Sequence, residues 1–194
     1  MLERGYEEAW IHVTRRLKEE LLPVYHYHQL NHTLFVIQAA VNIAGWEEVA
    51  GEDLVLLKTA ALYHDTGFLI NHKNHEELSM QIATEELPRF GFSSAQIDRI
   101  NQMILATKLP QSPKDELSRI LCDADLFYLG TDLFSEWAEL LFQELQALGT
   151  MSDRNIWMAH QVRFLQEHRY HIPAVMSHLN EKKSRHLEEL LKKL

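Results

Sequence analysis

Apolar residues recur along most of the chain at spacings of three and four, which is the period of an amphipathic α-helix. Near the N-terminus, for example, Trp10, Val13 and Leu17 share one face. Pro23 follows this segment and should end it. Alternating apolar and polar residues, the pattern typical of strands, are nearly absent, and glycine and proline are scarce at 7 and 5 residues. We therefore expect an all-α fold.

The same periodicity, together with turn residues, divides the chain into about nine helical segments. In chain order they are residues 8–21, 34–44, 54–62, 75–86, 94–107, 116–127, 133–148, 153–168 and 174–194. Gly45 is expected to end the second segment, and Asn74 is expected to cap the fourth. No repeat, low-complexity stretch or linker interrupts the pattern, so residues 1–194 should form one globular domain.

Composition narrows the class of protein. Hydrophobic residues make up 46% of the 194 residues and charged residues 24%, which is ordinary for a globular protein. The net charge of −9 argues against a broad nucleic-acid-binding surface. The single cysteine, Cys122, fits a reducing compartment, and no apolar run approaches the ~20 residues of a membrane span. The charged N-terminal segment lacks the apolar stretch of a signal peptide, so we expect a cytoplasmic protein.

The segment around Leu62 is the most informative part of the chain. Its helix is apolar on nearly every face and should be buried, yet it runs directly into His64 and Asp65. Burying an imidazole and a carboxylate is costly unless both have partners. A metal ion is the simplest shared partner, because both groups are good metal ligands.

Two other apolar segments carry groups of the same kind. His28 and His32 would share a helix face if the helix has begun by His28, although a hydrogen-bonded core histidine is the alternative for His32. Asp123 and Asp125 diverge by about 200° on a helix, so only one of them should face a given ion. For Asp123, a surface position or a packing hydrogen bond is the alternative.

Together these segments supply two imidazoles and two carboxylates on successive buried helices: His32, His64, Asp65 and Asp125. Such a set suits a borderline divalent ion and leaves positions for water.

The order His, His-Asp, Asp on an all-α chain resembles the signature of the HD-domain metal-dependent phosphohydrolases. The resemblance covers residues 27–130, with residues 131–194 expected to pack on that core. It implies that His32, His64, Asp65 and Asp125 are the metal ligands. It also favours Asp125 over Asp123 as the last of them.

A second resemblance lies just before the first ligand. The stretch from Tyr27 to His32 resembles the YHNxxH element of cyclic-nucleotide phosphodiesterases, with Gln29 in place of the asparagine. In those enzymes the first histidine protonates the leaving oxygen, which implies that His28 is a general acid. The HDxxH continuation of those enzymes is absent here, because Thr66 and Gly67 follow Asp65.

The resemblance also bears on the number of ions. His75 lies near one position that binds the second ion in dinuclear members, but their later His-His pair is missing and Lys108 lies in that region. We therefore expect one divalent ion, with Mn, Fe, Co, Ni, Zn and Mg not distinguished, and a second ion as the weaker alternative. His75 would contact phosphate or water, and Lys108 would balance phosphate charge.

The resemblance implies hydrolysis of a phosphate ester by metal-activated water, with Asp65 accepting a proton. The expected substrate is a small nucleotide or a related phosphomonoester or diester, with no membrane or long nucleic acid as partner and a homodimer left open. Two alternatives remain. One is a non-catalytic helical module that binds a metal or a partner, and the other is a di-iron oxygenase built on similar helices.

Overall fold

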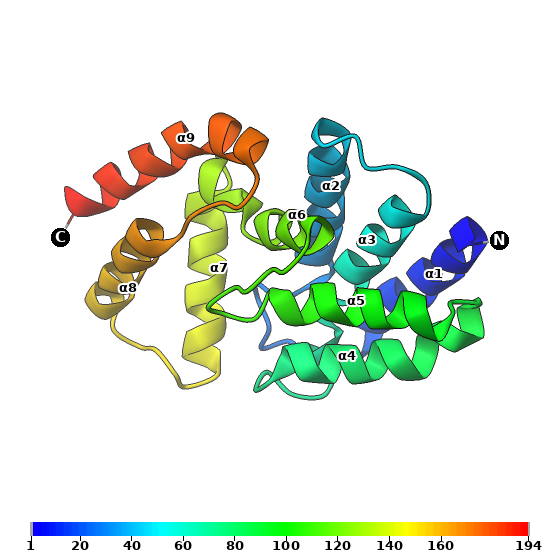
Figure 1. The fold of residues 1–194 in the computed structure, drawn as a ribbon. Coiled ribbons are helices and arrows are strands. Elements are labelled where there is room, and N and C mark those ends of the chain that lie inside the picture. The colour runs from blue at the N-terminus through cyan, green and yellow to red at the C-terminus, as the bar shows by residue number, and fades with distance from the viewer. Residues whose placement is uncertain (1, 194) are drawn as a thin grey trace.

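The computed structural model describes residues 2–193 as helices and connecting loops (Figure 1). Over these residues the fold is all-α, which confirms the prediction from periodicity. The α-helices are α1 (Leu2–Glu20), α2 (Leu30–Trp46), α3 (Gly51–Tyr63), α4 (His75–Glu86), α5 (Ser94–Ala106), α6 (Glu116–Asp125), α7 (Phe134–Ala147), α8 (Arg154–Glu167) and α9 (Pro173–Leu191). The 3-10 helices are η1 (Thr66–Leu69), η2 (Leu87–Phe90) and η3 (Phe127–Gly130).

Helix α3 lies at the centre of the fold because its sequence is apolar on nearly every face. Eight of its residues between Val55 and Tyr63 are buried. The helix packs against α1, α2 and α5, and the small side chains of Ala60 and Ala61 are fully buried in these contacts. The C-terminal end of α3, which leads into His64, therefore lies in the interior.

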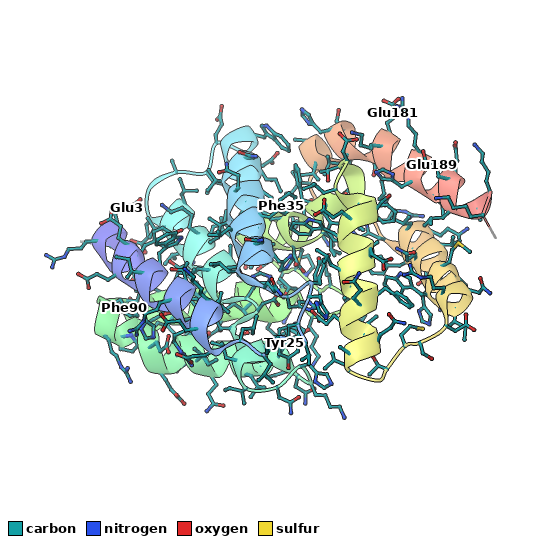
Figure 2. All side chains as sticks on the ribbon, turned by 180° about the vertical axis from the view of Figure 1, so that it is seen from behind. Glu3, Tyr25, Phe35, Phe90, Glu181 and Glu189 are labelled. Atoms are coloured by element: carbon teal, nitrogen blue, oxygen red, sulfur yellow. The ribbon has the colours of Figure 1, made fainter. Side chains whose placement is uncertain are left out.

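A second group of helices stands beside this core. Helices α7, α8 and α9 lie together on the side of the molecule opposite α1 (Figure 1). A separate apolar cluster holds them, with Tyr128, Trp137 and Leu165 among its members. Phe35, labelled on α2 in Figure 2, lies on the side of this helix that faces α7. Its ring packs on Trp137 of α7, with ring centroids 4.6 Å apart, and joins the two groups.

Several predicted helix ends differ from the structure by one or more residues; the first helix, for example, begins at Leu2 and not at residue 8. Helix α4 spans the predicted residues and Asn74 is its N-cap residue, but the Asn74 backbone is left-handed at φ 55° and ψ 39° and its side chain forms no cap hydrogen bond. Gly45 lies inside α2, which ends at Trp46, and the turn follows at Glu48 with φ 57°. The helix expected to reach Phe127 ends at Asp125, and the chain tightens into η3. The last residue of the final predicted segment, Leu194, lies outside the described residues.

Within residues 2–193, no helix combines the length and the apolar character that crossing a bilayer requires.

Candidate metal centre and active site

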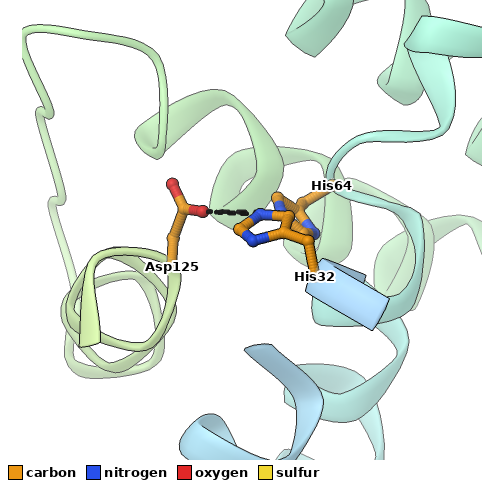
Figure 3. A group of neighbouring side chains, drawn as sticks. All are labelled: His32, His64 and Asp125. Atoms are coloured by element: carbon orange, nitrogen blue, oxygen red, sulfur yellow. Dashed lines mark hydrogen bonds and ion pairs between the residues drawn. The ribbon is translucent and has the colours of Figure 1, made fainter. Parts of the chain in front are cut away.

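The ends of three helices meet at one point in the interior (Figure 3). His32 lies in the first turn of α2, His64 directly follows α3, and Asp125 is the last residue of α6. Asp65 follows His64 and precedes η1. Because the C-terminal ends of α3 and α6 carry partial negative charge, both helices favour a cation here.

The four side chains approach closely. The Nε2 atoms of His32 and His64 lie 3.2 Å apart. Asp65 Oδ2 lies 3.2 Å from His32 Nε2 and 3.0 Å from His64 Nε2, and Asp125 Oδ1 lies 3.2 Å and 3.5 Å from the same two atoms. One atom each from His32, His64 and Asp125 fall within 4.8 Å of one another, which is the spacing of ligands around one metal ion. The structure thus brings together all four predicted ligand residues.

Hydrogen bonding outside the cluster fits a metal as the missing partner. His64 Nδ1 lies 2.8 Å from the carbonyl oxygen of Ala61 and donates to it, so the Nε2 of a neutral His64 keeps its lone pair. Asp65 Oδ2 is buried, and although it faces both imidazole Nε2 atoms it forms no hydrogen bond of regular geometry within residues 2–193. An unpartnered buried carboxylate oxygen is costly. Oxygen and nitrogen atoms that face one another in this way are suited to share a cation.

The two carboxylates and the two imidazoles of the cluster largely balance one another's charge. Burial lowers the pKa of His32 and His64, but the close approach and negative charge of the Asp65 and Asp125 carboxylates outweigh burial and raise both pKa values. Burial raises the pKa of the two carboxyls, but the two imidazoles outweigh it and lower both. The four groups therefore favour positive charge at their centre, which a divalent ion supplies by displacing protons.

Comparison with known families gives a concordant result. The sequence model of the HD domain matches residues 30–128, about half of the chain. The chain belongs to the HD-domain family. Members of this family are generally metal-dependent hydrolases. The family and the His-His-Asp cluster together indicate that this chain binds a divalent metal ion. No significant match was found among curated proteins or among solved structures.

His28 lies immediately before the HD-domain match, at the edge of the cluster. It does not share a helix face with His32, because α2 begins at Leu30, but a turn still places the two ring centroids 5.9 Å apart. Its ring stacks on Phe68 with centroids 4.0 Å apart. His28 Nδ1 lies 2.5 Å from Oε1 of Glu144, which fixes the ring from the other side.

Glu144 was not predicted from the sequence. Its Oε2 accepts hydrogen bonds from the backbone N–H groups of Tyr27 and His28 at 2.9 and 3.0 Å. Burial raises the pKa of the Glu144 carboxyl, but the bonds to His28 and Tyr27 outweigh burial and lower it. The available signal was weak: a carboxylate falls in line with Trp137 and Leu141 on the buried face of α7.

Three polar side chains, those of His75, Glu76 and Lys108, extend the site on the side of α4. His75, the first residue of α4, has Nε2 3.4 Å from Asp65 Oδ1 and 3.5 Å from Glu76 Oε1. Glu76 is buried and was also missed by sequence reasoning. Lys108 pairs with Glu77 near the surface. The roles predicted for His75 and Lys108 stay predictions, but both line the same cavity as Asp65 and Asp125.

That cavity has a volume of about 430 Å³, in the range of about 300–1,000 Å³ typical of small-molecule sites. His28, Asp65, His75, Lys108 and Asp125 all contribute to its lining. Residues of the HD-domain match form one part of the wall, residues of α7 and α8 form another, and Tyr27, His28 and Leu129 adjoin the match at its two ends.

Asp123 is neither a surface residue nor part of the cluster. It is fully buried, and its two oxygens accept hydrogen bonds from the backbone N–H groups of His171 and Ile172 at 2.8–3.1 Å. Burial raises its pKa to about 7, although these bonds and the Lys183 charge act to lower it. The surface alternative was wrong, because Asp123 anchors the loop between α8 and α9.

Proposed function

We propose that the protein hydrolyses a small phosphate ester, with one divalent ion held by His32, His64, Asp65 and Asp125. The observation that carries the proposal is the position of His28 and Lys108 in the lining of the cavity into which Asp65 and Asp125 face. A metal-ligand set, a proton donor and a cation beside one cavity are the parts that phosphate-ester hydrolysis needs.

A divalent ion bound there would acidify water and stabilise charge on the phosphoryl oxygens. Asp65, whose Oδ1 faces His75, is placed to accept a proton from the attacking water. The water oxygen forms a bond to phosphorus. The bond between phosphorus and the ester oxygen of the alcohol breaks, and that oxygen leaves. His28 donates its proton to the departing oxygen, so the products are an alcohol and phosphate from a monoester, or an alcohol and a phosphomonoester from a diester.

Glu144 acts on this reaction through His28. Its carboxylate accepts from Nδ1 and leaves Nε2 as the ring nitrogen available to the substrate. Stacking on Phe68 restricts the ring further. Lys108 and His75 would contact the phosphate, since both line the cavity near the carboxylates.

Small phosphorylated compounds, with nucleotides as the first class to test, are the proposed substrates. The net charge of −9 disfavours long nucleic acids by general repulsion. The 430 Å³ cavity likewise fits a small ester better than a polymer.

The test is elemental analysis of the purified protein, followed by a panel of phosphomonoesters and diesters assayed with the metal found. We expect a divalent ion near one equivalent, phosphate release, and loss of both in Asp65→Ala. A metal-loaded protein that releases no phosphate or alcohol from any ester would favour the non-catalytic module. A redox-active diiron centre would favour the oxygenase alternative.

A further inference from the structure

The cavity beside the metal centre is divided into a charged end and an apolar end. The charged end consists of the groups around the cluster, where His75 contacts both Asp65 and Glu76. The remainder lies against one apolar cluster, to which Leu129, Phe134 and Ala138 belong and on which Leu141 and Phe164 pack. We call this remainder the apolar lobe.

Two helices supply most of the walls of the apolar lobe. Phe134, Ala138 and Leu141 follow one another at spacings of four and three along α7. Trp157 and Phe164 are seven apart on α8 and face the same cavity. Because these spacings place residues on one helix face, α7 turns an apolar stripe toward the lobe, and α8 turns a stripe on which His160 and Gln161 lie between the two aromatic residues.

The lobe is a feature of this chain beyond the family match. The HD-domain match ends at residue 128, and α7 and α8 begin after it. Helix α8 packs against α9, and α7 packs against η3. The C-terminal helices therefore hold open an apolar space next to the site that the matched residues form.

We infer that the ester this site takes has an apolar alcohol part, an alkyl or aryl group that occupies the lobe while its phosphate lies at the metal centre. The inference deepens the proposed function and rests on it. A nucleoside in the lobe would place sugar hydroxyls and base edges against leucine and phenylalanine, where they lose hydrogen bonds to water. An alkyl group gains about fourfold in affinity for each buried methylene.

The polar lining residues of α8 do not change this assignment. His160 is exposed and Gln161 is only partly buried, so both keep access to water. The buried side chains of the lobe are apolar apart from the hydroxyl groups of Tyr27 and Tyr128, and burial determines which groups a ligand must leave unpaired.

The experiment measures binding of alkylphosphonates, which cannot be hydrolysed at an ester bond, to the metal-loaded protein by calorimetry. Chains of two, four, six and eight carbons are compared with phenylphosphonate and with a panel of nucleoside monophosphates. We expect affinity to rise about fourfold per methylene until the lobe is filled. The affinity of phenylphosphonate shows whether an aromatic ring fits the lobe as well as an alkyl chain does. Equal affinity at all chain lengths, or tighter binding of a nucleoside monophosphate than of the longest chain, would overturn the inference.

Two variants test whether the lobe is the binding place. Ala138→Phe should fill the lobe and abolish the gain from four to eight carbons, while two-carbon binding stays within about twofold. Ala147→Phe, at an exposed position of the same helix, is the matched control and should behave as the natural chain. If affinity is independent of chain length in both variants, or rises with chain length in both, the lobe is not where the alkyl chain binds.

Folding and function can be separated from this result. If Ala138→Phe fails to fold, Leu141→Gln takes its place in the test. This substitution keeps the volume of a half-buried lobe residue and changes only its polarity, so it should lower the affinity for the eight-carbon phosphonate more than about fivefold. If affinity depends on chain length but no ester is turned over, the proposed hydrolysis is wrong and the lobe assignment stands. If esters are turned over without any dependence on chain length, the lobe assignment is wrong and hydrolysis stands.

Discussion

Oε1 of Glu144 lies 2.5 Å from Nδ1 of His28, although 116 residues separate them in the chain. The other oxygen of the same carboxylate holds the backbone N–H of His28 at 3.0 Å. One buried side chain of α7 thus fixes both the ring and the main chain of the proposed proton donor, which lies just outside α2.

We predict that Glu144→Gln lowers kcat by about tenfold or more while bound metal stays at the natural level. A glutamine has one acceptor oxygen where the carboxylate has two, so a buried N–H group is left without its partner at a cost of about 1–3 kcal/mol of folding stability. The measurement is steady-state turnover with elemental analysis on the same samples. Glu139→Gln, on the same helix and paired with Arg154 at the surface, is the control and should leave turnover unchanged.

Comparing esters with different leaving groups shows whether Glu144 acts on proton donation by His28 or only on the stability of the fold. An ester with a nitrophenol leaving group needs little protonation, so Glu144→Gln and His28→Gln should slow it much less than an alkyl ester. The double variant should be no slower than His28→Gln, because the carboxylate acts through the ring. Equal slowing of both ester types would count against the acid role of His28.

The two aspartates at the end of α6 should separate metal binding from folding. Asp125→Asn should lose the ion and all turnover, because Asp125 Oδ1 approaches both imidazoles of the cluster. Asp123→Asn should retain the ion and lose about 1–3 kcal/mol of unfolding free energy, because the amide satisfies only part of the His171 and Ile172 donors. The checks are metal content after dialysis and chemical denaturation; loss of metal in Asp123→Asn alone would reverse the assignment.

The sequence was sufficient for the fold class and for finding four residues that the structure brings together, His32, His64, Asp65 and Asp125, because both depend on local patterns. An apolar helix that ends in His64 and Asp65 indicates a buried polar site whatever surrounds it. Glu144 and the partners of Asp123 could not be found in this way, since each contact joins segments more than 40 residues apart. The left-handed turn at Asn74 was missed because asparagine favours both this backbone conformation and helix capping.

Gly67 keeps α4 close to the metal centre. A Cβ added at Gly67 would lie 2.0 Å from the carbonyl oxygen of His75 and 2.8 Å from its Cα, so backbone would have to move. We predict that Gly67→Ala lowers unfolding free energy by about 1–3 kcal/mol and weakens metal binding, because His75 is displaced from Asp65. Thermal unfolding and metal titration measure the two effects.

Gly45→Ala is the matched control for this prediction. Nothing lies within 4 Å of a Cβ built at Gly45, which sits in the last turn of α2. The substitution should leave metal binding unchanged and raise stability by up to about 1 kcal/mol, because alanine is the better helix former. If Gly67→Ala is as stable as Gly45→Ala, η1 and α4 can move apart at little cost, and the prediction for Gly67 is wrong.

The last prediction concerns acid stability and the buried pair of His168 and Lys183. Lys183 Nζ donates to the His168 carbonyl at 2.7 Å and lies 3.1 Å from His168 Nδ1. Burial and then the Lys183 charge lower the pKa of His168 to about 3, with Arg169 and His171 adding to the effect and Asp125 opposing it. In the unfolded chain the same imidazole titrates near its ordinary value of 6.5.

Between these two pKa values the unfolded state binds the extra proton, so stability falls as pH falls below about 6.5 and the loss continues toward pH 3. We predict that His168→Gln removes this part of the acid sensitivity, reducing the loss of unfolding free energy between pH 7 and pH 5 by about 1–2 kcal/mol. Lys183→Met should reduce the loss by a smaller amount, because burial is the larger cause. Urea unfolding of the three proteins at several pH values gives the comparison, and parallel curves would show that His168 is not the group that titrates.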